Sequence, residues 1–129
     1  MSRYNWVDTL KFKDSELMPV VIQDCDSQKV LMVAYMNKKA LELTLKTGEV
    51  HFYSRSRKKL WKKGETSGCI QKVKEILVDC DEDTLLIKVD QKVASCHEGY
   101  RSCFYRKVDS SGNLKIVEKK IFEPKDLYK

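Results

Sequence analysis

Residues 19–48 decide the fold, and they read P-V-V-I-Q-D-C-D-S-Q-K-V-L-M-V-A-Y-M-N-K-K-A-L-E-L-T-L-K-T-G. Two short apolar runs rich in β-branched residues, 19–22 and 30–35, flank the turn-forming stretch 24–27. Apolar runs of this length on either side of a polar, turn-prone segment are typical of paired strands. This part of the chain therefore predicts a β-hairpin with a loop longer than two residues.

A short helix and further strands are predicted after the hairpin. Asn37 is a good N-cap, residues 38–46 favour a helix, and Gly48 is a common stop signal. Strand-like patterns cover residues 50–54, 84–89, 104–108 and 114–122, with partial alternation over residues 71–78. The basic residues after Ser54 look like a loop. One helix among many strands predicts an α+β, mainly-β fold, and we expect residues 1–129 to form a single domain.

Composition places the chain among globular proteins. Its 129 residues are 42% hydrophobic and 34% charged, with a formal net charge of +6. The positive charge favours a partner that carries phosphate, either a nucleic acid or a phosphorylated small molecule. No apolar run approaches the ~20 residues of a membrane span, and no signal peptide is evident, so we expect a cytoplasmic protein with no membrane partner. Five cysteines in a reducing compartment favour metal ligation or burial over disulfides.

An acidic cluster occupies residues 79–83. Three aspartates alternate there around one thiol: Asp79, Asp81 and Asp83, with Cys80 between the first two. In an extended segment these carboxylates share one face and Cys80 points to the other, and carboxylate oxygens suit Mg²⁺. An EF-hand is excluded, because Thr84 stands where that loop needs Gly and Asp90 where it needs Glu. A solvated acidic turn remains an alternative.

Thiols and an imidazole form a second candidate cluster. Cys80, Cys96 and Cys103 are farther apart in sequence than the ligands of a zinc ribbon, so zinc ligation and simple burial both stay open. Three protein ligands would leave a fourth zinc position for water, as in catalytic sites. His97 follows Cys96 directly and is a candidate proton-transfer group, or else an ordinary loop histidine.

Residues 51–68 are rich in basic residues with aromatic residues among them. Arg55 and Arg57 fall on one face of a strand end, and arginine forks suit phosphate oxygens. Trp61 offers a flat ring for a purine, and Lys63 lies just before a flexible glycine. Solvated loops and modules that bind single-stranded nucleic acid show the same pattern.

Together these stretches closely resemble phosphoribosyl-AMP cyclohydrolases, which act in histidine biosynthesis. The most specific blocks are L-M-V-A-Y-M-N at 31–37, F-Y-S-R-S-R-K-K-L-W-K-K-G-E-T-S-G at 52–68, D-C-D-E-D at 79–83 and C-H-E-G-Y-R-S-C-F at 96–104. The resemblance implies a small mixed, barrel-like β fold capped by a helix, in an intertwined homodimer. It implies a hydrolase that opens the adenine ring of N1-(5-phosphoribosyl)-AMP at the N1–C6 bond.

The same resemblance implies a set of site residues. Zinc would lie on Cys80, Cys96 and Cys103, with one of the three donated by the partner subunit, and magnesium on Asp79, Asp81 and Asp83. His97 is the expected proton-transfer group. Phosphate contacts are expected from Arg55, Arg57, Lys63 and Arg101, and a base stack from Trp61.

The chain departs from the family pattern in two places. The family usually has Gly-Pro-Ala before its Cys-His, where this chain has Lys92-Val93-Ala94-Ser95, and it often has His or Asn where this chain has Cys69. Neither departure removes an expected metal ligand. A zinc module that binds RNA would explain the charge and the thiols, but the aspartates would repel a phosphate backbone. A redox thiol protein is disfavoured because no C-x-x-C occurs.

Overall fold

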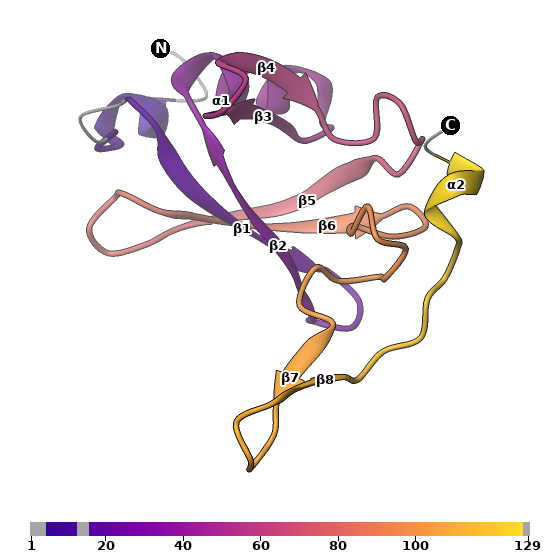
Figure 1. Cartoon of the computed structure of the whole chain (residues 1–129). Helices are drawn as coiled ribbons and strands as arrows, with labels where there is room; N and C mark the ends of the chain where they lie inside the picture. The colour runs from indigo at the N-terminus through magenta and orange to yellow at the C-terminus, as the bar shows by residue number, and fades with distance from the viewer. Residues whose placement is uncertain (1–4, 13–15, 128–129) are drawn as a thin grey trace.

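A mixed four-stranded sheet forms the centre of the computed structural model, which describes residues 5–12 and 16–127 (Figure 1). Its order is β2-β1-β6-β5, and the strands are β1 (Met18–Asp24), β2 (Val30–Met36), β5 (Gln71–Val78) and β6 (Leu85–Gln91). β1 pairs parallel with β6, whereas β1–β2 and β5–β6 are antiparallel. The expected α+β, mainly-β class is confirmed. The expected barrel-like closure is not found, since the described strands form an open sheet.

One face of this sheet carries the core. Every second residue of β1 and of β6 is buried, which is the alternation expected when a sheet is covered on one side. Helix α1 (Lys38–Thr47) and the hairpin of β3 (His51–Ser54) with β4 (Lys59–Lys62) cover that face (Figure 1). Phe52 is fully buried there, and its ring centroid lies 5.1 Å from that of Trp61.

The predicted hairpin and helix are confirmed. β1 and β2 pair with Met18 opposite Met36, and the turn between them contains Cys25. The Asn37 side chain accepts a 2.8 Å hydrogen bond from the Ala40 amide at the start of α1. Gly48 ends the helix with φ +76° and donates its amide proton to the Thr44 carbonyl. In both cases, residues within or next to the element were enough to predict it.

The remaining elements differ in part from what the sequence predicts. The basic segment after Ser54 is not all loop, because β4 pairs there with β3 and sets Trp61 opposite Phe52. The strand expected over 114–122 is confirmed at its start, as β8 (Leu114–Ile116), which pairs with β7 (Arg106–Val108). Residues 79–83 form a turn, which the sequence had left open beside an extended segment. A 3₁₀ helix, η1 (Asn5–Thr9), and a short α2 (Pro124–Leu127) were not predicted. None of the described helices is long and apolar enough to cross a membrane.

Backbone hydrogen bonds close the loop that follows β6 and also tie it to the sheet. The Ser95 amide donates to the Arg101 carbonyl at 2.9 Å, and the Cys103 amide donates to the Leu31 carbonyl at 2.7 Å. Val93, near the start of the loop, has φ +58°, a left-handed conformation in which β-branched residues are strained. This is where the family pattern has Gly-Pro-Ala, so the missing glycine leaves backbone strain.

Replacing Val93 with Gly should therefore stabilise the protein. Relief of the left-handed conformation is worth about 1–2 kcal/mol, and the greater freedom of an unfolded glycine offsets about half of that. We expect the melting temperature of Val93→Gly to rise by about 2–4 °C in a thermal unfolding experiment. Val93→Ala keeps the Cβ atom and serves as the control, with little change expected. A lower melting temperature for Val93→Gly would contradict the strain.

Candidate active site

The three aspartates gather in the turn between β5 and β6. One carboxylate oxygen from each of Asp79, Asp81 and Asp83 lies within 4.8 Å of the others. The turn, rather than an extended strand, brings them together, because Asp79 Oδ1 accepts hydrogen bonds from the amides of Asp83 at 3.0 Å and Thr84 at 3.3 Å. Clustered carboxylate oxygens are the donor set that Mg²⁺ prefers, so the residues fit such an ion.

Cys80 lies in this same turn, far from the other two expected zinc ligands. It is exposed, and its sulfur is 3.9 Å from Asp81 Oδ1. Cys96 and Cys103 belong to the loop beyond the opposite end of β6, a strand of seven residues. At about 3.3 Å per residue, β6 separates the two groups by roughly 20 Å. Within one chain, the three thiols do not form one site.

Cys96 and Cys103 do lie together. The Cys103 sulfur interacts with Cys96 and with the Ser95 hydroxyl, and burial of the sulfur, aided by the nearby Cys96, raises the pKa of the Cys103 thiol to about 11. Much of residue 103 is nevertheless exposed, whereas Cys96 is buried. Two adjacent sulfurs are a soft donor pair that fits Zn²⁺, which needs further ligands to complete a tetrahedron.

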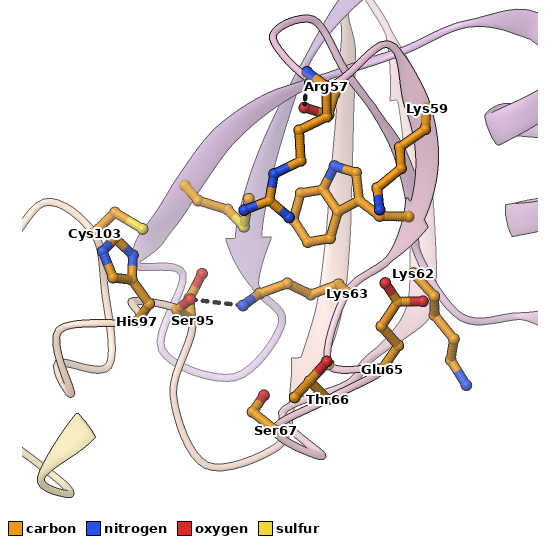
Figure 2. Close-up of a pocket in the computed structure, with 14 residues that line it drawn as sticks. Arg57, Lys59, Lys62, Lys63, Glu65, Thr66, Ser67, Ser95, His97 and Cys103 are labelled. Carbon is orange, nitrogen blue, oxygen red and sulfur yellow. Dashed lines mark hydrogen bonds between the residues drawn. The ribbon is translucent and has the colours of Figure 1, made fainter. Parts of the chain in front are cut away.

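Lys63 extends beside these thiols (Figure 2). It is 6% exposed, and its ammonium group donates a 2.7 Å hydrogen bond to the Ser95 carbonyl. Burial lowers the pKa of Lys63, and the nearby sulfurs of Cys103, Cys69 and Cys96 oppose that shift. The buried lysine thus fixes the backbone next to Cys96 and supplies positive charge beside the thiols.

A pocket of about 480 Å³ opens over this cluster. Figure 2 shows His97 beside Cys103 at one side and Arg57 and Lys59 at the other. The pocket is lined by Met32, Ser54, Arg57, Lys59, Trp61, Lys62, Lys63, Gly64, Glu65, Thr66, Ser67, Ser95, His97 and Cys103. Cationic, aromatic and sulfur-bearing side chains therefore meet in one cavity.

A tight turn forms one wall of this cavity. Gly64 has φ +83°, and a Cβ atom there would lie 2.5 Å from the Cys69 carbonyl carbon. The Gly68 amide closes the turn by donating to the Gly64 carbonyl at 2.8 Å. Only glycine fits at position 64, which explains why the backbone can fold back so closely. Cys69 is fully buried behind this turn.

The structure separates the predicted substrate contacts into two groups. Arg57, Trp61 and Lys63 line the pocket together with His97. The guanidinium of Arg55 instead lies over the ring of Tyr35, 4.0 Å from the ring centroid. His97 is well placed for proton exchange with solvent, because its side chain is 77% exposed and its Nε2 lies 3.3 Å from Glu98 Oε1.

Arg101 has a different environment from the one expected of a phosphate contact. Its Nη1 donates to the carbonyls of Gln91 and Val93, each at 2.8 Å, and its Nη2 lies 3.5 Å from Asp24 Oδ1. Although burial of Asp24 works in the other direction, hydrogen bonds from Ser27 and the charge of Arg101 hold the pKa of that carboxyl below its usual value. Arg101 thereby ties the cysteine loop to the ends of β6 and β1.

Sequence reasoning missed Ser95 and the polar residues of the Gly64–Gly68 turn. Ser95 is 3% exposed and lines the pocket, and its hydroxyl has no conventional hydrogen-bond partner among the described residues. The hydroxyl does interact with the Cys103 sulfur. Position 95 was noted in the sequence only as part of a departure from the family pattern. Its place directly before Cys96 could have indicated that Ser95 belongs to the site.

Comparison with known proteins identifies the family. Residues 32–105 match the model of the phosphoribosyl-AMP cyclohydrolase family. A phosphoribosyl-AMP cyclohydrolase of Methanosarcina acetivorans is 59% identical over 124 residues, covering 95% of this chain and 98% of the relative. One from Pelotomaculum thermopropionicum is 53% identical over 122 residues, covering 95% of each. With this identity over almost the whole length, the chain belongs to the phosphoribosyl-AMP cyclohydrolase family.

Proposed function

We propose that the protein catalyses the phosphoribosyl-AMP cyclohydrolase reaction of histidine biosynthesis, the hydrolytic opening of the adenine ring of N1-(5-phosphoribosyl)-AMP. The observation that carries the proposal is the pocket in which two thiols, an imidazole, an indole and several cations meet. In a hydrolase of this family, such a pocket fits a nucleotide with a phosphate at each end and a base between them. The substrate is a small molecule, and no nucleic acid is required.

Zinc is the proposed metal at the thiols. Cys96 and Cys103 supply two soft ligands, and Cys80, which lies beyond the reach of either in its own chain, would come from a second copy of the chain. Bound zinc would act as a Lewis acid that makes water more acidic near neutral pH. A homodimer with a site at its interface follows from this assignment.

The chain's own residues would orient the substrate. The partly exposed ring of Trp61 offers a stacking surface for the adenine, and the Arg57 guanidinium reaches the same cavity to neutralise a phosphate. Lys63 holds the Ser95 carbonyl and with it the backbone of the Cys96 loop. Alkylation at N1 makes C6 of the substrate electrophilic, so water adds at C6 and the N1–C6 bond breaks.

His97 is the proposed proton-transfer group. Its imidazole lies at the pocket edge beside Cys103, is open to solvent, and can accept a proton from water and pass it on. The aspartates of the β5–β6 turn would bind Mg²⁺, which their clustered oxygens fit. Such an ion would neutralise the repulsion between three adjacent carboxylates and keep the turn compact.

Removing one thiol tests the zinc assignment. Cys96→Ala should abolish turnover of phosphoribosyl-AMP, followed by absorbance, and lower the zinc content measured by mass spectrometry. A zinc chelator should inhibit the wild-type protein in the same assay. Cys25→Ala, in the β1–β2 turn, is the matched control and should keep both activity and zinc. Full activity in a zinc-poor Cys96→Ala protein would sink the assignment.

Mixing two inactive variants tests the shared site. Cys80→Ala and Cys103→Ala should each be inactive alone, but exchange of their subunits should restore about a quarter of wild-type activity. Random exchange makes about half of the dimers mixed, and each mixed dimer holds one intact site of two. No recovery in a mixture proven to contain mixed dimers would show that all three thiols act within one chain.

The role of His97 can be separated from metal binding. His97→Ala should keep its zinc and lose about 100-fold or more in turnover number, the usual effect of removing a general acid–base group. A near-normal rate would assign proton transfer to another group.

A further inference from the structure

The C-terminal part of the chain folds back onto the cysteine loop. After β8, residues 117–123 form an irregular segment, which we call the strap, and it runs back from the β7–β8 hairpin to α2 (Figure 1). The Ile121 amide donates a 2.7 Å hydrogen bond to the Gly99 carbonyl, and the Phe122 amide shares that acceptor at 3.4 Å. The strap therefore contacts the loop at a residue far from it in sequence.

Glycine at position 99 permits this close approach. Gly99 has φ +99°, and a Cβ atom there would lie 2.2 Å from the Phe122 carbonyl oxygen. That separation is far below van der Waals contact, and the oxygen belongs to backbone that cannot rotate aside as a flexible side chain could. A larger residue would therefore have to push the strap away from the loop, and it would also be strained by the positive φ.

Gly99 also closes the turn that carries His97. The Gly99 amide donates to the Cys96 carbonyl at 3.0 Å, and the Cys96 amide donates to the Tyr100 carbonyl at 3.1 Å. His97 and Glu98 stand at the centre of this turn, and both are exposed. Because neither side chain is buried, the place of the His97 backbone depends on how the two ends of the turn are held.

Different parts of the protein hold these two ends. At the Cys96 end, the ammonium group of Lys63 holds the carbonyl of the preceding residue, Ser95, at 2.7 Å. At the Gly99 end, the hydrogen bond from the Ile121 amide supplies the corresponding contact. The inner wall of the pocket thus holds one end of the turn and the strap holds the other.

The strap is itself anchored before it reaches Gly99. The Val117 amide donates to the Tyr105 carbonyl at 2.9 Å, and Glu118 forms an ion pair with Lys29 in the β1–β2 turn. The side chain of Ile121 is 52% exposed, so the residue contacts the loop mainly through its backbone. A segment that is already oriented loses less entropy when it makes a further contact.

We propose that Ile121 and Gly99 are positioning residues for the reaction, because the strap holds the turn at Gly99 and so sets where His97 stands at the pocket edge. The inference rests on the proposed function, since it takes His97 as the proton-transfer group. Proton transfer needs hydrogen-bond reach, and a small displacement of the group lowers the rate. The proposed substrate contacts at Arg57 and Trp61 belong to another part of the chain and do not depend on the strap.

Removing a single amide proton tests the proposal in the full-length protein. Ile121→Pro deletes the donor to Gly99, so kcat should fall about tenfold while KM stays within about twofold of the wild-type value. Two matched controls should both keep the wild-type kcat. Ile121→Ala removes the side chain but keeps the amide proton. Lys119→Pro places a proline in the same strap, at an amide that makes no hydrogen bond to the described residues.

Hydrogen exchange followed by NMR tests the contact without any turnover. In Ile121→Pro the Gly99 amide, which is bonded to the Cys96 carbonyl, should exchange about tenfold faster or more, because the turn opens more often. The Gly48 amide at the end of α1 lies outside this loop and should exchange at the wild-type rate. Zinc content should also remain that of the wild type, which separates a displaced His97 from a lost metal.

Several outcomes overturn the proposal. Unchanged exchange of the Gly99 amide in Ile121→Pro would show that the strap does not hold the turn. An unchanged kcat, or an equal loss of kcat in Lys119→Pro, would show that this contact does not position His97. A wild-type protein that fails to turn over phosphoribosyl-AMP would count against the proposed function, and the exchange of the Gly99 amide would still decide whether the strap holds the turn.

Discussion

The parallel pairing of β1 with β6 is the constraint on which the rest of the structure depends. It places β6 in the sheet interior, with the acidic turn before it and the cysteine loop after it. A strand cannot bend back on itself, so the groups at its two ends stay about a strand length apart. Helix α1 and the β3–β4 hairpin cover one face of the sheet. The acidic turn and the cysteine loop therefore lie at the two ends of β6.

Buried polar side chains turn the loop after β6 into a defined structure. Gln91 accepts a 2.7 Å hydrogen bond from Gln71 and donates its own amide protons to carbonyls that include those of Cys69 and Ala94. Arg101 and Lys63 satisfy further carbonyls in the same region. Because an unpaired buried carbonyl costs about 1–3 kcal/mol, these side chains strongly favour a single loop conformation. The two thiols owe their proximity to this network rather than to regular secondary structure.

The sequence predicted mainly those elements whose formation depends on residues close together in the chain. The β1–β2 hairpin and the capped helix carry their signals within a few residues, and both were found. β4 was missed because its alternation is weak within a basic run and its partner for Trp61, Phe52, lies nine positions earlier. The distance between Cys80 and Cys96 could not be predicted either, because it depends on how far the strand between them extends. Assignment of metals to these residues came from family resemblance and stays a prediction, as do the roles of His97 and Arg57.

The separation of Cys80 from Cys96 and Cys103 by the length of β6 has a consequence for how the proposed zinc site behaves on dilution. If each site needs Cys80 from one chain and Cys96 with Cys103 from another, a lone chain holds only part of two sites. Specific activity then follows the monomer–dimer equilibrium, and it falls once the protein concentration drops below the dissociation constant. The amount of enzyme in a cell would thus set not only how many sites exist but also what fraction of them is complete.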